Sequence, residues 1–200
     1  MNEGDRASEP PTTERDEATV PDAAAGPGGW LSFWMGKFEA RIPADRLYAK
    51  NHMWALEIGD AGNAAEGPPS AAGVPRAVAR GPLFRFGFSA YAVRLLQDVY
   101  FLDWHVDAPA MLAERQEIGE IESSKAESAL YAPLAGTLAT INRDLLADPS
   151  TINVDNYGRG WLFEIAGPAD GLLTAEEYLV HLEAAWKLAE RTIKGQMNEG

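Results

Sequence analysis

Lys125 is the residue whose type and setting best support chemistry in this sequence. It lies in a polar stretch between two strand-like segments, 118–122 and 130–133, so we predict a hairpin with the lysine in its turn. A lysine at a hairpin tip exposes its amine to a modifying enzyme. A group attached to that amine would form a flexible arm on a rigid hairpin. The candidate modification site is Lys125 with its hairpin neighbours Glu122, Ser123, Ser124 and Ala126, although a lysine in such a turn is, taken alone, more often only a solubilising charge.

Other reactive residues do not form a recognisable constellation. His52, His105 and His181 are scattered along the chain, which contains no cysteine and no His-x-x-x-His pair, so we predict no metal site. Glu176 and Glu177 stand at the start of a predicted helix, where capping explains them better than acid–base catalysis. We therefore expect no catalytic residues.

Short strands are predicted along most of the chain. Phe84, Phe86 and Phe88 alternate with smaller or charged residues, and Trp161, Phe163 and Ile165 repeat this period of two, which is typical of strands. The other strand-like stretches are 38–42, 48–58, 99–104 and 136–141. This pattern predicts a mainly β fold, a compact sandwich or barrel.

Two helices are predicted among these strands. Ser89 is placed to cap a short helix over 91–96, with Val93 and Leu96 turned inward. Thr174 and Glu177 have the spacing of a capping box, and apolar residues recur at three- or four-residue intervals after them. The chain is therefore expected to end in an amphipathic helix that runs to about residue 194.

The composition indicates one domain with extensions. Residues 1–29 read as a disordered acidic tail, and 30–47 as an aromatic N-terminal segment. The domain itself is expected over 48–178, with a mobile insertion rich in alanine, glycine and proline at 59–82. Residues 179–200 complete the chain as a helix extension and tail.

The net charge and the cysteine content limit which classes of partner and which cellular compartments are plausible. A formal net charge of −13 disfavours nucleic acid and favours cationic partner surfaces. No apolar run is long enough to span a bilayer, and the start of the chain lacks the features of a secretory or mitochondrial signal. We therefore expect a cytoplasmic protein without a membrane or nucleic-acid partner.

Several blocks of residues around the lysine carry a longer resemblance. They are Tyr48 with His52-Met53-Trp54, Gly87–Ala92 with Leu96-Gln97-Asp98, Glu122–Ala126 with Tyr131, Pro133 and Gly136, then Asn142, Leu145, Pro149, Asn153, Tyr157, Gly160–Leu162, and Leu172–Tyr178. In type and spacing, these blocks resemble the H proteins of the glycine cleavage system. The resemblance runs from about Tyr48 to about Tyr178, interrupted by the insertion.

The resemblance implies a fold, a cofactor and a set of partners. H proteins have a barrel-sandwich hybrid fold, like other lipoyl domains, and carry lipoate covalently on the lysine that matches Lys125. A lipoate ligase or lipoyltransferase attaches it. The arm then shuttles an aminomethyl group between glycine decarboxylase and aminomethyltransferase, and dihydrolipoyl dehydrogenase reoxidises it. The H protein itself catalyses none of these steps.

Two departures from the family pattern leave the cargo open. Met53 stands where the family has a glutamate that pairs with the loaded arm, and Ala129 replaces a second acid, although Glu127 lies two residues away on the same predicted face. Alternatives are an H-like lipoyl carrier for sulfur oxidation or lipoate relay, and an interaction module that is never lipoylated.

Overall fold

The computed structural model describes residues 29–60 and 81–197. The predicted tail, apart from Gly29, and the centre of the predicted insertion therefore lie outside the described residues. The strands are β1 (Trp30–Met35), β2 (Phe38–Pro43), β3 (Leu47–Tyr48), β4 (Met53–Asp60), β5 (Pro82–Phe88), β6 (Val99–Trp104), β7 (Ala110–Leu112), β8 (Glu117–Ser123), β9 (Glu127–Tyr131), β10 (Gly136–Ile141) and β11 (Trp161–Ala166). The helices are α1 (Ala90–Leu96), α2 (Asp144–Ala147), α3 (Thr151–Val154) and α4 (Ala175–Met197).

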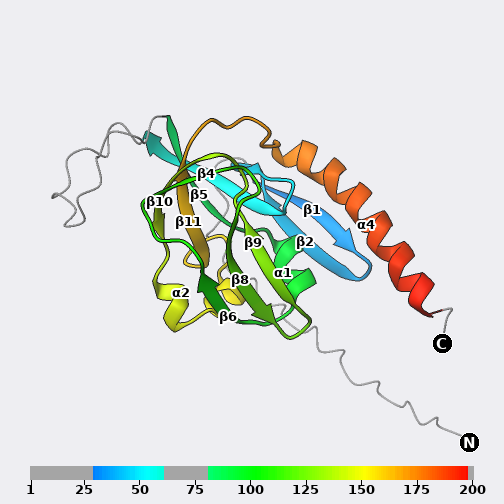
Figure 1. The fold of residues 1–200 in the computed structure, drawn as a ribbon. Coiled ribbons are helices and arrows are strands. Elements are labelled where there is room, and N and C mark those ends of the chain that lie inside the picture. The colour runs from blue at the N-terminus through cyan, green and yellow to red at the C-terminus, as the bar shows by residue number, and fades with distance from the viewer. Residues whose placement is uncertain (1–28, 61–80, 198–200) are drawn as a thin grey trace, which may run out of the picture.

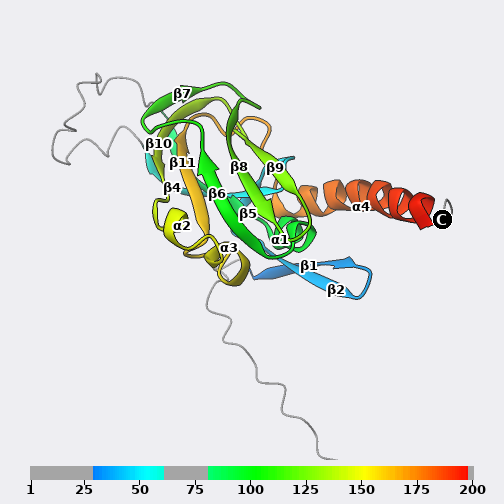
Figure 2. The ribbon, with the colours of Figure 1, turned by 60° about the horizontal axis from the view of Figure 1, so that its bottom comes forward.

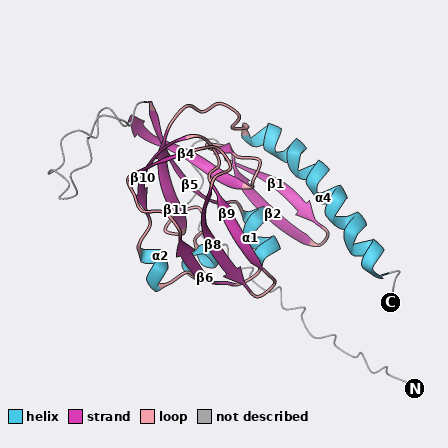
Figure 3. Cartoon of the chain, in the orientation of Figure 1, coloured by secondary structure: helices cyan, strands magenta, loops and turns pink. Residues whose placement is uncertain are grey.

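The strands form three antiparallel sheets (Figures 1 and 3). A six-stranded sheet has the order β3-β4-β5-β11-β10-β7, and a three-stranded sheet has the order β6-β8-β9. The third sheet is the β1–β2 hairpin. The mainly β prediction and the terminal helix are therefore confirmed, and the described residues contain no helix long and apolar enough to cross a membrane.

The core between the two larger sheets follows the predicted strand pattern. Phe84, Phe86 and Phe88 are buried, and β5 lies between β4 and β11. Strand β11 departs from simple alternation because the residues of both its faces are buried after Trp161. The carboxylate of Glu164, on the face opposite Phe163 and Ile165, accepts hydrogen bonds from Arg85 Nε at 2.9 Å and Nη2 at 2.7 Å. This ion pair makes a charged residue tolerable on a buried strand.

A second apolar cluster joins the N-terminal aromatic segment to α4. Phe33, Met35 and Ile42 of the β1–β2 hairpin are buried in the same cluster as Tyr178 and Leu182 of α4. Figures 1 and 2 show the hairpin and α4 on the same side of the molecule. The predicted aromatic segment thus forms a hairpin whose apolar side chains help to cover the domain.

Both predicted helix starts are present. The Ser89 hydroxyl accepts a hydrogen bond from Ala92 N, and α1 buries Tyr91 and Ala92, whereas Val93 and Leu96 pack only partly against the core. At α4, Thr174 N donates to Glu177 Oε2 at 2.8 Å and Glu177 N donates to Thr174 Oγ1 at 3.2 Å. These reciprocal bonds are the predicted capping box.

Candidate functional site: the lysine hairpin and its cleft

Lys125 lies in the tight turn between β8 and β9, as predicted. The last register pair of the two strands is Glu122 with Glu127. Ser123 organises the turn: its Oγ accepts hydrogen bonds from Lys125 N at 3.4 Å and Ala126 N at 3.3 Å, and donates one to Ala126 O at 3.0 Å. Ser123 is buried, so this hydroxyl fixes the backbone on which the lysine stands.

The turn is also tied to the end of α1. Ser124 N lies 3.2 Å from Gln97 O and 3.3 Å from Asp98 O. Gln97 and Asp98 have φ values of 54° and 38°, in the left-handed region that favours glycine. Gln97 is the position where the resembling family has glycine, and the backbone conformation gives a physical reason for that preference. The predicted hairpin is therefore held from two sides.

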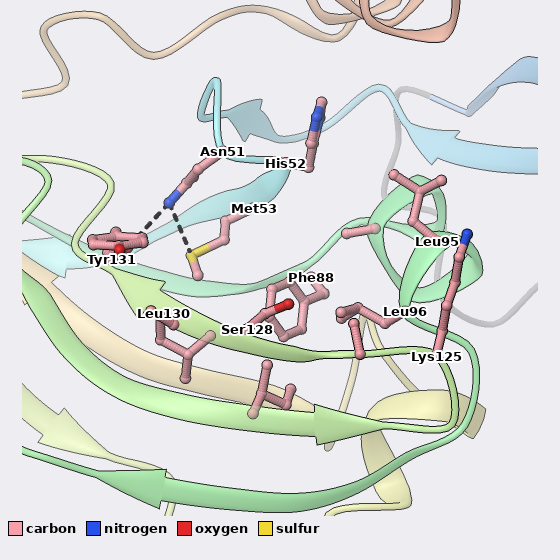
Figure 4. A pocket seen from close by; sticks show the side chains of 14 residues that line it. Asn51, His52, Met53, Phe88, Leu95, Leu96, Lys125, Ser128, Leu130 and Tyr131 are labelled. Atoms are coloured by element: carbon pink, nitrogen blue, oxygen red, sulfur yellow. Dashed lines mark hydrogen bonds between the residues drawn. The ribbon is translucent and has the colours of Figure 1, made fainter. Parts of the chain in front are cut away.

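An apolar cleft of about 430 Å³ opens beside the hairpin (Figure 4). Its walls come from the residues before β4, the end of β5, α1, and the strands β8 and β9. They are Asn51, His52, Met53, Phe88, Ala92, Leu95, Leu96, Ile121, Lys125, Ala126, Ser128, Ala129, Leu130 and Tyr131. Figure 4 shows Lys125 beside Leu95 and Leu96 at one end of the cleft, with Asn51 and Tyr131 at the other.

The far wall of the cleft has one amide and a thioether, but no carboxylate among its described lining residues. Asn51 Nδ2 donates to Tyr131 O at 3.0 Å and lies 3.8 Å from Met53 Sδ. Ala129 lines the cleft, whereas Glu127 does not; Glu127 lines a separate hollow with other acids of β8. The lining therefore matches an apolar occupant better than a cation.

His52 connects the cleft to α4. Its Nδ1 lies 3.2 Å from Tyr178 Oη, which is in turn 2.8 Å from Ser89 Oγ. Burial, together with the neighbouring His181 whose ring centroid is 5.4 Å away, lowers the pKa of His52 to about 4. His52 is therefore neutral at pH 7, and burial also raises the pKa of Tyr178, so this network carries no charge.

Sequence reasoning placed the hairpin residues but missed most of the cleft. Asn51, Phe88, Leu95 and Tyr131 come from four segments that only the fold brings together. The location of Leu95 could have been predicted from the sequence, since this residue lies on the short helix that Ser89 caps. That of Asn51 could not, because its role depends on a backbone carbonyl 80 residues away in the chain.

A small β domain that displays a lysine on a braced hairpin beside an apolar cleft has the architecture of an attachment domain for a prosthetic arm. A family model described as glycine cleavage H-protein matches residues 77–192. A glycine cleavage system H protein of Neisseria meningitidis serogroup C is 37% identical over 141 residues, which cover 68% of this chain and 93% of that protein.

Two further relatives agree with this match. A glycine cleavage system H protein of Mycolicibacterium smegmatis is 35% identical, covering 70% of this chain and 95% of its own. The crystal structure of a glycine cleavage system H protein from Mycobacterium marinum aligns with a TM-score of 0.52 and 33% identity, covering 68% of this chain and 95% of that one. The chain belongs to the glycine cleavage H-protein family, and the expected barrel-sandwich hybrid fold is confirmed.

Proposed function

We propose that this protein is a lipoyl carrier of the glycine cleavage system, with lipoate attached to Lys125. The domain would comprise residues 48–178, with 59–82 as an insertion. Its partners would be a lipoate ligase or lipoyltransferase, then glycine decarboxylase, aminomethyltransferase and dihydrolipoyl dehydrogenase, all in the cytoplasm. The protein would act as a carrier and not as a catalyst; the bound lipoyl group would supply the dithiolane that accepts and releases the cargo.

The observation that carries this proposal is the position of Lys125 on a braced turn at one end of an apolar cleft. Nζ would form an amide with the lipoate carboxyl that the ligase has activated, the activating group would leave, and the lysine would lose its charge. Ser123 and Ser124 would keep the turn rigid while the attached chain moves. The cleft would shield the apolar arm from water, at about 0.8 kcal/mol for each buried methylene group.

The test of attachment is the intact mass of the full chain after incubation with lipoate, ATP and a lipoate ligase. We expect one lipoyl group on the unchanged protein and none on Lys125→Arg, which keeps the charge but offers no acylable amine. The matched control Lys50→Arg removes another lysine and should be lipoylated normally. An unmodified parent protein under these conditions would favour the interaction module, and modification of Lys125→Arg would place the site elsewhere.

A second candidate concerns the cargo. The cleft lining contains no carboxylate to pair with a cationic aminomethyl nitrogen, and Met53 and Ala129 line it instead. This favours an H-like lipoyl carrier for another pathway, such as sulfur oxidation or lipoate relay. The lipoylated protein should be combined with competent glycine decarboxylase, aminomethyltransferase and dihydrolipoyl dehydrogenase. Turnover of glycine supports the first candidate; no turnover with fully lipoylated protein supports the second.

A further inference from the structure

Three potential metal ligands meet on the outer face of the three-stranded sheet, away from the cleft. Asp103 and Glu120 are register partners across β6 and β8, and His105 follows two residues after Asp103. One ligand atom from each of the three side chains lies within 4.8 Å of the others, and all three residues are exposed. Because the three side chains are exposed and free to rotate, modest rotations would bring one ligand atom from each onto a single small ion.

The pairing of Asp103 with Glu120 has an energetic cost that a cation would remove. Like charges directly opposite each other on neighbouring strands are destabilising. Among the described residues, neither carboxylate forms an ion pair with a lysine or arginine. The surroundings add further negative charge, because Glu117, Glu122 and Glu127 line a hollow of about 270 Å³ together with Glu120.

The backbone fixes the positions from which the three side chains extend. His105 N donates to Ile118 O at 3.0 Å, which extends the strand ladder past β6. A Cβ on Gly119 would lie 2.3 Å from Asp103 O, so glycine permits the close approach of the two strands here. Glu117 Oε1 lies 3.3 Å from His105 Nδ1, and such a carboxylate contact orients an imidazole for metal binding.

We propose that Asp103, His105 and Glu120 bind a divalent transition-metal ion. One imidazole nitrogen with two carboxylate oxygens suits borderline ions such as Zn²⁺ better than Mg²⁺, which prefers oxygen ligands alone and retains its water. The ion neutralises the charges that oppose each other across β6 and β8. It therefore stabilises the sheet that carries the lysine hairpin. This site is independent of lipoylation and differs from the sequence-based expectation of no metal site.

The test measures zinc binding by isothermal titration calorimetry and the melting temperature with and without zinc chloride, on the full chain. We expect saturable binding of one zinc ion and a rise in melting temperature. His105→Gln should weaken binding at least tenfold. Asp103→Asn should raise the melting temperature of the metal-free protein, because it removes the charge repulsion, and abolish the further rise with zinc.

The matched control is Glu122→Gln, which removes a carboxylate from the same face without removing a ligand and should bind zinc normally. An equal rise in melting temperature with magnesium chloride, or unchanged zinc binding by His105→Gln, would overturn the site. If zinc shows no saturable binding while Asp103→Asn weakens association with a partner enzyme, the acidic face is a protein-docking surface and the metal site is wrong.

Discussion

The β8–β9 hairpin separates two hollows of opposite character. On its inner face, Ile121 and Leu130 help to line the apolar cleft beside Lys125. On its outer face, Glu120, Glu122 and Glu127 line a hollow in which carboxylates predominate. Side chains alternate along β8, so Glu120 and Glu122 lie on the face opposite Ile121, while Ile121, Ser128 and Ala129 border both hollows. The hairpin thus offers an apolar shelter and an acidic surface on either side of one lysine.

This contrast shows that different residues of the hairpin contribute to its stability and to its charge. The inner residues hold the fold, because they are removed from water and have close neighbours. The outer residues set the electrostatic field near the lysine and contribute little to packing. Substitutions on the two faces should therefore differ in the size and the sign of their effect on the free energy of unfolding. They should also differ in the property that they change.

The largest expected effect is on the inner face. Ile121 is 1% exposed, and Ile121→Ala should lower the free energy of unfolding by about 3–4 kcal/mol, since it removes buried methyl groups and leaves a cavity. Urea denaturation would measure this. The adjacent outer-face change Glu122→Gln is the control and should shift stability by less than about 0.5 kcal/mol. Similar losses for both changes would contradict the division between the faces.

A charge placed in the cleft should lower the free energy of unfolding somewhat less than Ile121→Ala does. Met53 is 2% exposed, and Met53→Glu should destabilise the unmodified protein by about 2–3 kcal/mol at pH 7, because the carboxylate would be buried beside Asn51, at the end of the cleft opposite Lys125. Met53→Gln has the same shape without the charge and is the control. The difference between the two variants should shrink in acid, as the glutamate becomes protonated; a constant difference would rule out a charge effect.

Neutral His52 should make stability depend on pH. The unfolded chain protonates this histidine near its ordinary pKa of 6.5, and the folded chain only near 4. The unfolded state therefore binds more protons between these values, so the stabilising contribution is present above pH 6.5 and is lost as the pH falls toward 4. The loss from about pH 7 to about pH 5 should be roughly 2 kcal/mol.

The variant His52→Asn should remove this component of the pH dependence. Asparagine tolerates the positive φ of 66° at this position and does not titrate. Urea denaturation at several pH values compares its slope with that of the parent protein, and equal slopes would contradict the assignment. His181→Gln should raise the pKa of His52, because the second imidazole also disfavours its charge; proton NMR titration would detect the change.

The smallest expected effect is on the outer face. Glu127 is exposed at the start of β9, and Glu127→Gln should change the free energy of unfolding by less than about 0.5 kcal/mol, with any gain reflecting reduced repulsion from Glu122. Thermal denaturation at low and high salt would measure it. A loss of more than about 1 kcal/mol would mean that this carboxylate has a structural partner.

Local signals in the sequence predict much of the attachment site. The turn at Lys125 follows from a polar stretch between two strand-like segments, and Thr174 with Glu177 marks the start of α4 within one turn. Phe84, Phe86 and Phe88 identify β5 because their period of two does not depend on the rest of the chain. These features depend on interactions between residues that are close in sequence.

Features that depend on register or on distant contacts could not be predicted. Asp103 meets Glu120 only because of how β6 pairs with β8, and a register shift between Val99 and Phe101 changes that pairing. His52 and His181 are far apart in sequence, yet α4 brings their rings together. The burial of both faces of β11 likewise depends on which elements cover it.

The pairing of Asp60 with Pro82 has a consequence for engineering this chain. These two residues are register neighbours at the ends of β4 and β5, so the ends of the intervening segment are joined to adjacent points of the sheet. Lengthening or shortening the segment between them should therefore leave the ladder on either side unchanged, provided that it still spans the two strand ends. The domain is therefore suited to the insertion of a reporter, or to the deletion of the segment, between Asp60 and Pro82.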